Sequence, residues 1–305
     1  MDISPYQLGA TLYVPATHPH IESVATGANI PELRSMVLCL EDSLSERDVQ
    51  HGLTRLTELA ENLSSHSRTD YPLVFIRPRN IEMAAHICQN INLHGITGLV
   101  LPKFNTSNMD AWLKAVGDNH LVLMPTLETQ DVMCQQSMAA LCERLMQPDT
   151  QRRILALRIG GNDLLNCIGI RRPQTGTLYD TPMAYVLGML VATFARRGFA
   201  LTAPVDERFQ SLEDLTQEVV NDLKYGFVGK TAIHPTQIAV IQNALKVKPE
   251  DHESALKIIN TSEAVFNHHG VMAEPATHRQ WASNILEQAK YNGVVPTMVL
   301  NSQDA

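Results

Sequence analysis

Two acidic residues, Glu128 and Asp163, stand where apolar runs give way to polar turns. Glu128 ends the run Leu121-Val-Leu-Met-Pro-Thr-Leu-Glu128, and Asp163 ends the run Ile154-Leu-Ala-Leu-Arg-Ile-Gly-Gly-Asn-Asp163. In a barrel of parallel strands such positions lie at the C-terminal rim, where active sites are found. Two carboxylates on neighbouring strand ends can hold Mg²⁺ and leave coordination positions open for a substrate. The alternative is that Asp163 only caps a turn.

Charged residues recur at the ends of the other apolar runs. They are Glu41, Asp42, Arg77, Arg79, Lys103, Asp206, Glu207 and His234. Charged side chains avoid full burial unless they are paired, so their recurrence at one end of nearly every unit indicates one shared polar site. The alternative is that strand ends simply meet water there.

Arg77 and Arg79 are two residues apart, so both can face the same side of a strand. Arginine forms bidentate pairs with carboxylates and can stabilise an enolate or bind a carboxylate substrate. The alternative is an ion pair with Glu41 or Asp42 from the adjacent strand. Lys103 would supply a further positive charge or pair with Glu128.

The apolar runs alternate with segments of helical spacing. We expect strands at residues 11–17, 35–42, 71–77, 98–103, 121–128, 154–163, 200–206 and 230–235. We expect helices near residues 46–63, 81–91, 108–116, 132–146, 182–197, 212–225 and 236–245. Eight strand-then-helix units predict an α/β fold, a (β/α)8 TIM barrel over residues 1–248. A doubly wound sheet is the rival, but the turn after the first run lacks its glycines.

Residues 249–305 exceed the barrel. Helical spacing near residues 253–266 and 277–291 predicts a C-terminal helical extension, which could form a lid or a subunit contact.

Composition excludes several classes of protein. The 305 residues carry a net charge of −8 with a pI near 5.8, which argues against nucleic-acid binding. No apolar stretch is long enough to cross a membrane, and the N-terminus shows no secretion signal. The five cysteines include no C-x-x-C pair, so we expect reduced, mostly buried thiols in a cytoplasmic protein.

Five segments together resemble the HpcH/HpaI aldolase and citrate lyase β-subunit family. The resemblance runs from residue 11 to about residue 290, and its segments keep the family's order and spacing. They are Leu40-Glu41-Asp42-Ser43-Leu44, Leu101-Pro102-Lys103, Pro125-Thr-Leu-Glu128-Thr129, Gly160-Gly-Asn-Asp163-Leu164 and Gly229-Lys-Thr-Ala-Ile-His-Pro-Thr-Gln-Ile238.

The resemblance implies a TIM barrel that binds Mg²⁺ (or Mn²⁺) through Glu128 and Asp163. It implies that Arg77 grips a substrate carboxylate and stabilises an enolate. We expect Glu41, Asp42 and Lys103 to form a supporting charge network around Arg77. The family cleaves or forms C–C bonds in β-hydroxy acids, often as CoA thioesters. It also implies a homo-oligomer, either a trimer or a hexamer.

Three departures from the family pattern concern the substrate side. The family's arginine after the first strand is absent from Ala16-Thr-His-Pro-His20, and its R-x-N segment reads Arg77-Pro78-Arg79. Its C-terminal pattern becomes Gly270-Val-Met-Ala-Glu274-Pro275, so Glu274 would replace a lid aspartate. We therefore expect Arg79 and Glu274 to contact substrate beside Arg77.

These observations predict a Mg²⁺-dependent carbon–carbon lyase or aldolase. Its substrate would be a small hydroxy- or keto-acid, either free or as a CoA thioester. Two alternatives remain open at this point. One is an acyl-CoA thioester hydrolase on the same barrel, and the other is a non-catalytic binding component of a stress-response system.

Overall fold

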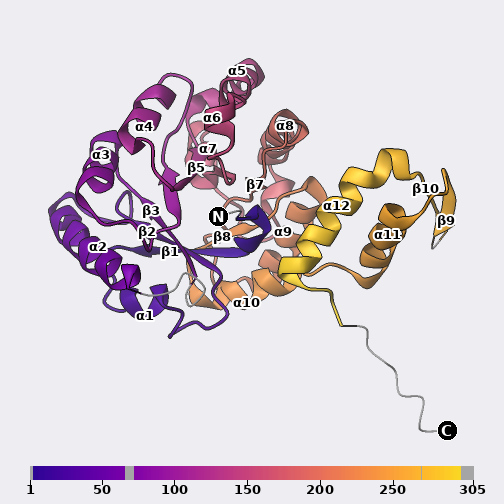
Figure 1. Cartoon of the computed structure of the whole chain (residues 1–305), viewed down its shortest axis with the longest axis horizontal. Helices are drawn as coiled ribbons and strands as arrows, with labels where there is room; N and C mark the ends of the chain where they lie inside the picture. Colours follow the sequence, from indigo (N-terminus) through magenta and orange to yellow (C-terminus); the bar gives the residue numbers. More distant parts are fainter. Residues whose placement is uncertain (1–2, 66–71, 269, 297–305) are drawn as a thin grey trace, which may run out of the picture. The chain divides into compact units, whose positions relative to one another are not determined.

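The computed structural model describes residues 3–65, 72–268 and 270–296. The chain separates into two compact units, residues 1–241 and residues 242–305, and each unit is described by itself. The order of elements along the chain can be followed in Figure 1. No helix in these described ranges is both long enough and apolar enough to cross a membrane.

The first unit is built on a sheet of eight parallel strands in the order β7-β6-β5-β4-β3-β2-β1-β8. The strand β1 pairs with both β2 and β8, and a parallel bridge joins Ala203 to Lys230, so the sheet nearly closes on itself. The predicted (β/α)8 barrel is therefore confirmed. The strands are β1 (Ala10–Pro15), β2 (Ser35–Cys39), β3 (Leu73–Arg77), β4 (Gly98–Leu101), β5 (Val122–Leu127), β6 (Leu157–Ile159), β7 (Leu201–Thr202) and β8 (Lys230–Ala232).

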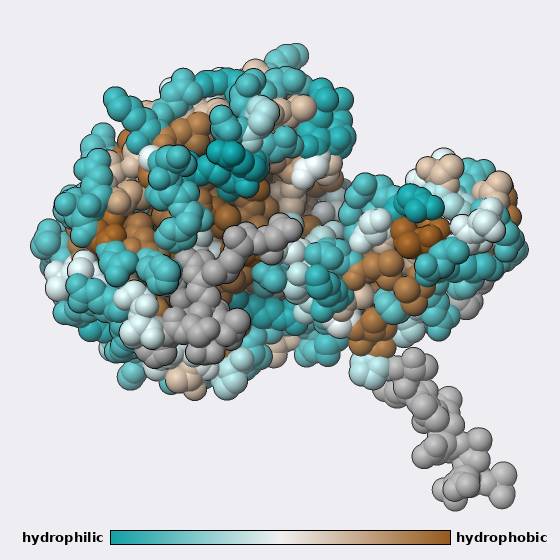
Figure 2. Space-filling view, in the orientation of Figure 1, coloured by the Kyte–Doolittle hydropathy of each residue, from teal (hydrophilic) through white to brown (hydrophobic). Residues whose placement is uncertain are grey.

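Helices follow the strands along the chain and surround the barrel (Figure 1). They are α1 (Ile21–Ala25), α2 (Val49–Ser64), α3 (Ile81–Asn90), α4 (Met109–Val116), α5 (Gln135–Leu145), α6 (Pro148–Gln151), α7 (Gly161–Cys167), α8 (Met183–Phe194), α9 (Leu212–Tyr225) and α10 (Pro235–Ala244). Leu56, Leu59 and Leu63 of α2 are buried, because spacings of three and four residues place them on one helix face. The outer helices present a mainly hydrophilic surface in the view of Figure 2.

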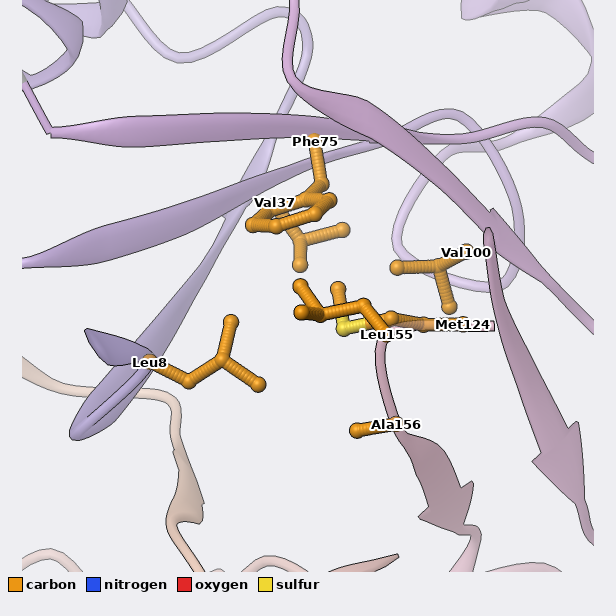
Figure 3. Packing of buried hydrophobic residues seen from close by; sticks show 7 residues of the cluster. All are labelled: Leu8, Val37, Phe75, Val100, Met124, Leu155 and Ala156. Carbon is orange, nitrogen blue, oxygen red and sulfur yellow. The ribbon is translucent and has the colours of Figure 1, made fainter. Parts of the chain in front are cut away.

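The inside of the barrel changes from apolar to polar along the strands. An apolar cluster fills one part of the interior (Figure 3) and consists of Leu8, Val37, Phe75, Val100, Met124, Leu155 and Ala156. Because alternate residues of a strand face the same side, β5 continues from Met124 to Thr126 and then to Glu128. Likewise, β6 continues from Ala156 to Arg158 and then to Gly160. Hydroxyl and charged groups thus accumulate toward the C-terminal ends of the strands.

The sixth unit differs from the prediction. We expected a strand that ends at Asp163, but β6 ends at Ile159 and α7 begins at Gly161. Asp163 therefore lies in the first turn of a short helix. The residues expected to form a polar turn, Gly161 to Asp163, instead form the first turn of α7. The first backbone N–H groups of a helix have no partner within the helix. The start of the predicted third strand, Tyr71, lies outside the described residues.

The second unit packs two helices around a hairpin. It contains α11 (Pro249–Asn260), β9 (Phe266–His268), β10 (Val271–Ala273) and α12 (Pro275–Asn292). Its core consists of Ala255, Ile258, Phe266, Ala273 and Ala282. The helix predicted to reach residue 266 instead ends at Asn260, and the hairpin was not predicted. Gly270 there has a φ of +78°, which favours glycine.

The cysteines are only partly buried. All five are free thiols, and Cys39 and Cys142 are buried. Cys134 and Cys167 are exposed, so the expectation of mostly buried thiols is wrong. Both exposed thiols lie in segments next to helix ends, where side chains meet solvent.

Candidate active site

Glu128 is held directly after β5 in a buried position. Its side chain follows Met124 and Thr126 on the inward face of the strand and is 3% exposed. Gly160, on the neighbouring strand end, makes room for it. A Cβ atom at position 160 would lie 2.4 Å from both the Cβ and the Oε2 atom of Glu128. Glycine is therefore required at position 160 if Glu128 keeps this conformation.

Asp163 and Glu128 line the same cavity, although 35 residues separate them in the chain. The cavity has a volume of about 160 Å³. Its polar lining comprises Tyr13, Arg77, Thr126, Glu128, Arg158, Asn162, Asp163 and Thr231. Among the described residues, Asp163 has no hydrogen-bond or ion-pair partner for its carboxylate. The structure thus brings together the two carboxylates that the sequence singled out.

The pKa of the Glu128 carboxyl is raised to about 7. Burial is the main cause, because it disfavours the charged form, and the negative charge of Asp163 adds to it. Arg77 and the backbone N–H of Lys103 act in the opposite direction. A cation between Glu128 and Asp163 would relieve their repulsion and favour the ionised form of both.

Arg77 connects this carboxylate to a second acid. Its Nη2 donates to Glu128 Oε1 at 2.9 Å and lies 2.7 Å from Glu41 Oε2. The Lys103 Nζ atom donates to Glu41 Oε1 at 2.8 Å and lies 3.8 Å from Asp42. Burial lowers the pKa of Arg77, but Glu128, Tyr13 and Glu41 outweigh it, so the net pKa is raised. The guanidinium therefore stays charged.

Lys103 contributes through its main chain as well. Among the described residues, Lys103 is the residue other than glycine that has a positive φ, and its value is 50°. In this left-handed conformation its N–H donates to Glu128 Oε1 at 2.7 Å. Backbone strain at a residue other than glycine often marks a functional site.

A family model described as a C–C bond lyase of the TIM-barrel fold matches residues 2–294. The chain belongs to this family. Its members are described as lyases of carbon–carbon bonds, in agreement with the resemblance of five sequence segments. A comparison with curated protein sequences found no match.

Several solved structures share the fold of this family member. CitE from Mycobacterium tuberculosis in complex with magnesium, acetoacetate and coenzyme A has a TM-score of 0.67 and 20% identity, covering 93% of this chain and 99% of that chain. RipC from Yersinia pestis has a TM-score of 0.59 and 20% identity, covering 79% and 96%. The citrate lyase β subunit from M. tuberculosis with oxaloacetate and magnesium has a TM-score of 0.56 and 19% identity, covering 79% and 99%.

The donor set fits Mg²⁺ in this family member. The described residues contain no group of three or more histidine, cysteine or acidic side chains that could hold a metal ion. Mg²⁺ does not need such a group, because it usually takes one or two carboxylates and completes its shell with water and substrate oxygens. Glu128 and Asp163 supply two carboxylates on one cavity, with space beside them.

Two residues predicted to contact substrate have other partners. Arg79 donates to Glu46 Oε2 at 3.1 Å and to the carbonyl oxygen of Leu44 at 2.5 Å, and it is not part of the cavity lining. It holds the loop after β2. Glu274 lies in the second unit before α12, where its side chain accepts from Thr277 Oγ1 at 3.4 Å. Substrate contacts by Arg79 and Glu274 stay predictions.

The remaining strand-end residues belong elsewhere. Asp206 and Glu207 pair with Arg172, and Asp206 also pairs with Arg208. The Nδ1 atom of His234 forms a hydrogen bond with the Oγ1 atom of Thr236, and the His234 ring stacks on the ring of Phe209. None of these residues lines the cavity described above, and one shared polar site for the whole set stays a prediction. Each finds an ion-pair or hydrogen-bond partner nearby.

Five polar residues of the cavity were not predicted: Tyr13, Thr126, Arg158, Asn162 and Thr231. Asn162 lies in the first turn of α7, and the other four lie within strands rather than at strand ends. Arg158 carried a usable signal, since a charged residue in the middle of an apolar run is unusual in a strand covered on both faces. A tyrosine or threonine in a strand carries no such signal, because both residues are common there.

Proposed function

We propose that the protein is a Mg²⁺-dependent carbon–carbon lyase or aldolase that acts on a small hydroxy- or keto-acid. The observation that carries this proposal is the convergence of Glu128 and Asp163 on one cavity beside the buried Arg77. Membership of the C–C bond lyase family supports the reaction class. Proteins of the same fold were solved with magnesium and with acetoacetate or oxaloacetate, which supports the metal and the kind of substrate.

Glu128 and Asp163 would hold the metal, which is Mg²⁺ or Mn²⁺ in this proposal. When bound, the metal supplies positive charge that polarises substrate oxygens. Asp163 is suited to this role because its carboxylate has no other described partner, whereas Glu128 is fixed by Arg77 and by the N–H of Lys103. One ligand is therefore rigid, and the other is available to the metal.

Arg77 would bind the substrate carboxylate or the enolate that forms when the bond breaks. Its Nε is buried and has no hydrogen-bond partner, while its Nη2 is held between Glu41 and Glu128. The two acids thus orient the guanidinium, and an unused donor remains. Glu41 and Lys103 are supporting residues in this scheme, and Asp42 lies at its exposed margin.

The cavity volume of about 160 Å³ suits a small acid. Pockets for drug-sized ligands are about 300–1,000 Å³. If the substrate is a CoA thioester, only its acyl part would enter the cavity. We also propose a cytoplasmic homo-oligomer, a trimer or hexamer, in which residues 249–305 supply a lid or a subunit contact. Light scattering of the purified protein tests the oligomeric state.

The direct test is calorimetric titration with Mg²⁺ and Mn²⁺, followed by assays of C–C cleavage on a panel of small hydroxy- and keto-acids and their CoA thioesters. Asp163→Ala should abolish metal binding and turnover while the melting temperature stays near that of the wild type. Asp149→Ala is the matched control, because Asp149 is an exposed acid on α6. Retained turnover of Asp163→Ala at saturating Mg²⁺ would contradict the assignment. A wild-type protein that binds no metal would favour the non-catalytic alternative.

A further inference from the structure

Arg158 is a buried charge inside the barrel. It is 1% exposed and is among the largest fully buried side chains of the chain. Its Nη2 donates to Thr231 Oγ1 at 2.5 Å, and its Nη1 lies 3.5 Å from Thr11 Oγ1. The ring of Tyr13 lies 5.2 Å from its guanidinium carbon. These neighbours are uncharged, so none of them neutralises the guanidinium.

No described carboxylate forms an ion pair with Arg158. Arg172, which is buried to a similar degree, pairs with Asp206, Glu207 and Glu218. Arginine stays charged at any physiological pH, and a buried charge without a counter-ion is costly. The position of Arg158 is therefore explained best by an anion that comes from outside the chain.

The cavity offers such an anion a place beside Arg158. The Nε of Arg158 and the Oγ1 of Thr126 are both buried without a hydrogen-bond partner, and both residues line the cavity. Buried polar atoms are normally satisfied, so two unsatisfied groups on one cavity indicate a missing ligand or water. A guanidinium and a hydroxyl are suitable donors for a carboxylate.

The subsite lies deeper in the barrel than the metal pair. Arg158 is in register with Thr126 across β5 and β6, and Glu128 follows Thr126 by two residues. Two residues of a strand span about 7 Å. An acid bound by its head group at Glu128 and Asp163 can therefore extend its tail along the inward face of β5 toward Arg158.

We propose that Arg158, together with Thr126 and Thr231, forms an anion subsite that binds a second carboxylate of the substrate. The substrate class is then a short dicarboxylic acid with its chelating end at Glu128 and Asp163. This inference rests on the proposed function, because that function places the head group of the acid at the metal. A carboxylate fits better than a phosphate, since one guanidinium matches a planar monoanion and the cavity is small.

The test compares succinate with butyrate, which has a methyl group in place of one carboxylate, by calorimetry in the presence of Mg²⁺. Wild-type protein should bind succinate at least about tenfold more tightly, as expected for one charge-assisted hydrogen-bonded pair. Arg158→Met should remove this preference and leave butyrate affinity unchanged. Arg158→Lys should restore it in part, and Thr126→Val should reduce it several-fold.

Arg172→Met is the matched control, since it also removes a buried guanidinium. It should lower the melting temperature and preserve the succinate preference, whereas Arg158→Met should melt at or above the wild-type temperature. An unchanged succinate preference in Arg158→Met would overturn the subsite. An equal loss of succinate affinity and butyrate affinity in Arg158→Met would also overturn the subsite, because such a loss would indicate that Arg158 has only a structural role.

Two further outcomes separate this inference from the proposed function. Tighter binding of 3-phosphonopropionate than of succinate would overturn the assignment to a carboxylate. A succinate preference that depends on Arg158 in a protein without lyase activity would support the subsite and refute only the reaction. The two proposals can thus fail independently.

Discussion

Two clusters of buried charge in the barrel behave in opposite ways. Beside α9 and β8, Lys230 Nζ donates to Glu218 Oε1 at 2.8 Å and to Asp222 Oδ2 at 2.9 Å. Arg172 Nη1 pairs with Glu218, and the hydroxyl of Tyr179 donates to Asp222 Oδ1 at 2.6 Å. None of these five side chains contributes to the buried atoms that lack a partner. We refer to them as the closed cluster.

The cavity presents the contrary case. Arg77, Arg158 and Thr126 each keep a buried atom without a hydrogen-bond partner. The glutamates differ accordingly: burial raises the pKa of both, but Lys230 and Arg172 outweigh it for Glu218, whose pKa falls to about 2. The pKa of Glu128 rises to about 7. Burial of charge alone therefore does not identify a site, whereas buried charge with unused atoms on a cavity does.

Removal of one charge from the closed cluster should have the largest effect on stability. Lys230→Met would leave Glu218 and Asp222 buried without their shared cation. Breaking a buried pair in this way costs about 3–5 kcal/mol in the free energy of unfolding. Urea denaturation measures it, with Arg158→Met as the comparison that should lose little. Equal stability of Lys230→Met and wild type would remove the distinction between the clusters.

Gly160→Ala should damage the cavity and spare the closed cluster. The added methyl would overlap Glu128, so the carboxylate must move. Overpacking of this kind costs about 1–3 kcal/mol, which corresponds to a loss in Mg²⁺ affinity of roughly 5- to 150-fold. Calorimetry measures the affinity. Gly188→Ala is the control, because a Cβ there would meet only Tyr225 at 3.5 Å. An unaltered affinity in Gly160→Ala would argue against Glu128 as a ligand.

The two glutamates should give opposite pH dependences. The pKa of Glu128 is higher in the folded chain than its ordinary 4.5, so the folded state binds the additional proton between pH 4.5 and 7. Its contribution to the stability of the metal-free protein must then decrease as the pH rises through that window, by on the order of 3 kcal/mol. The pKa of Glu218 is lowered, so its contribution is present above pH 4.5 and is lost as the pH falls toward 2.

Unfolding curves of wild type and Glu128→Gln at several pH values, measured in EDTA, isolate the first of these contributions. The difference in the free energy of unfolding between the two proteins should vary between pH 4.5 and 7 and be constant above pH 7. Mg²⁺ should stabilise the wild type more at pH 8 than at pH 6, because the metal displaces the proton. A difference that is independent of pH would show that Glu128 titrates normally.

The smallest effect is expected at Lys103. Its side chain is 53% exposed, and Arg77 continues to pair with Glu41 when the lysine is removed. Lys103→Met should therefore change the free energy of unfolding by less than about 1 kcal/mol. Chemical denaturation with Lys114→Met as a control helix lysine checks this value. A loss of several kcal/mol would mean that the cavity network is as interdependent as the closed cluster.

The fold could be predicted because its signals are local. Most strands are continuous apolar runs, and the helices between them have their own apolar spacing, as in α2 with Leu56, Leu59 and Leu63. The convergence of Glu128 and Asp163 could also be predicted, because parallel strands end at the same rim. The sixth unit failed at its boundary, since glycine, asparagine and aspartate suit both a turn and the start of a helix.

The choice of partners could not be predicted. Arg172 lies in the long loop after α7 and forms ion pairs with Asp206 and Glu207, which were expected to belong to the polar site. Nothing in the spacing of these residues indicates that contact, because it depends on where the loop packs. Arg158 was missed for a related reason: its neighbours Thr11 and Thr231 come from the opposite ends of the barrel sequence.

The left-handed conformation of Lys103 has a consequence for how this protein can diverge. The group that it presents to Glu128 is a peptide N–H, which every amino acid except proline possesses. The chain could therefore exchange the lysine side chain, and with it the charge at the mouth of the barrel, while this contact to the carboxylate is retained. Substrate preference can drift at position 103 without a change in the inner framework. Proline is excluded there because it lacks the N–H and cannot adopt a positive φ, and β-branched residues are disfavoured at that φ.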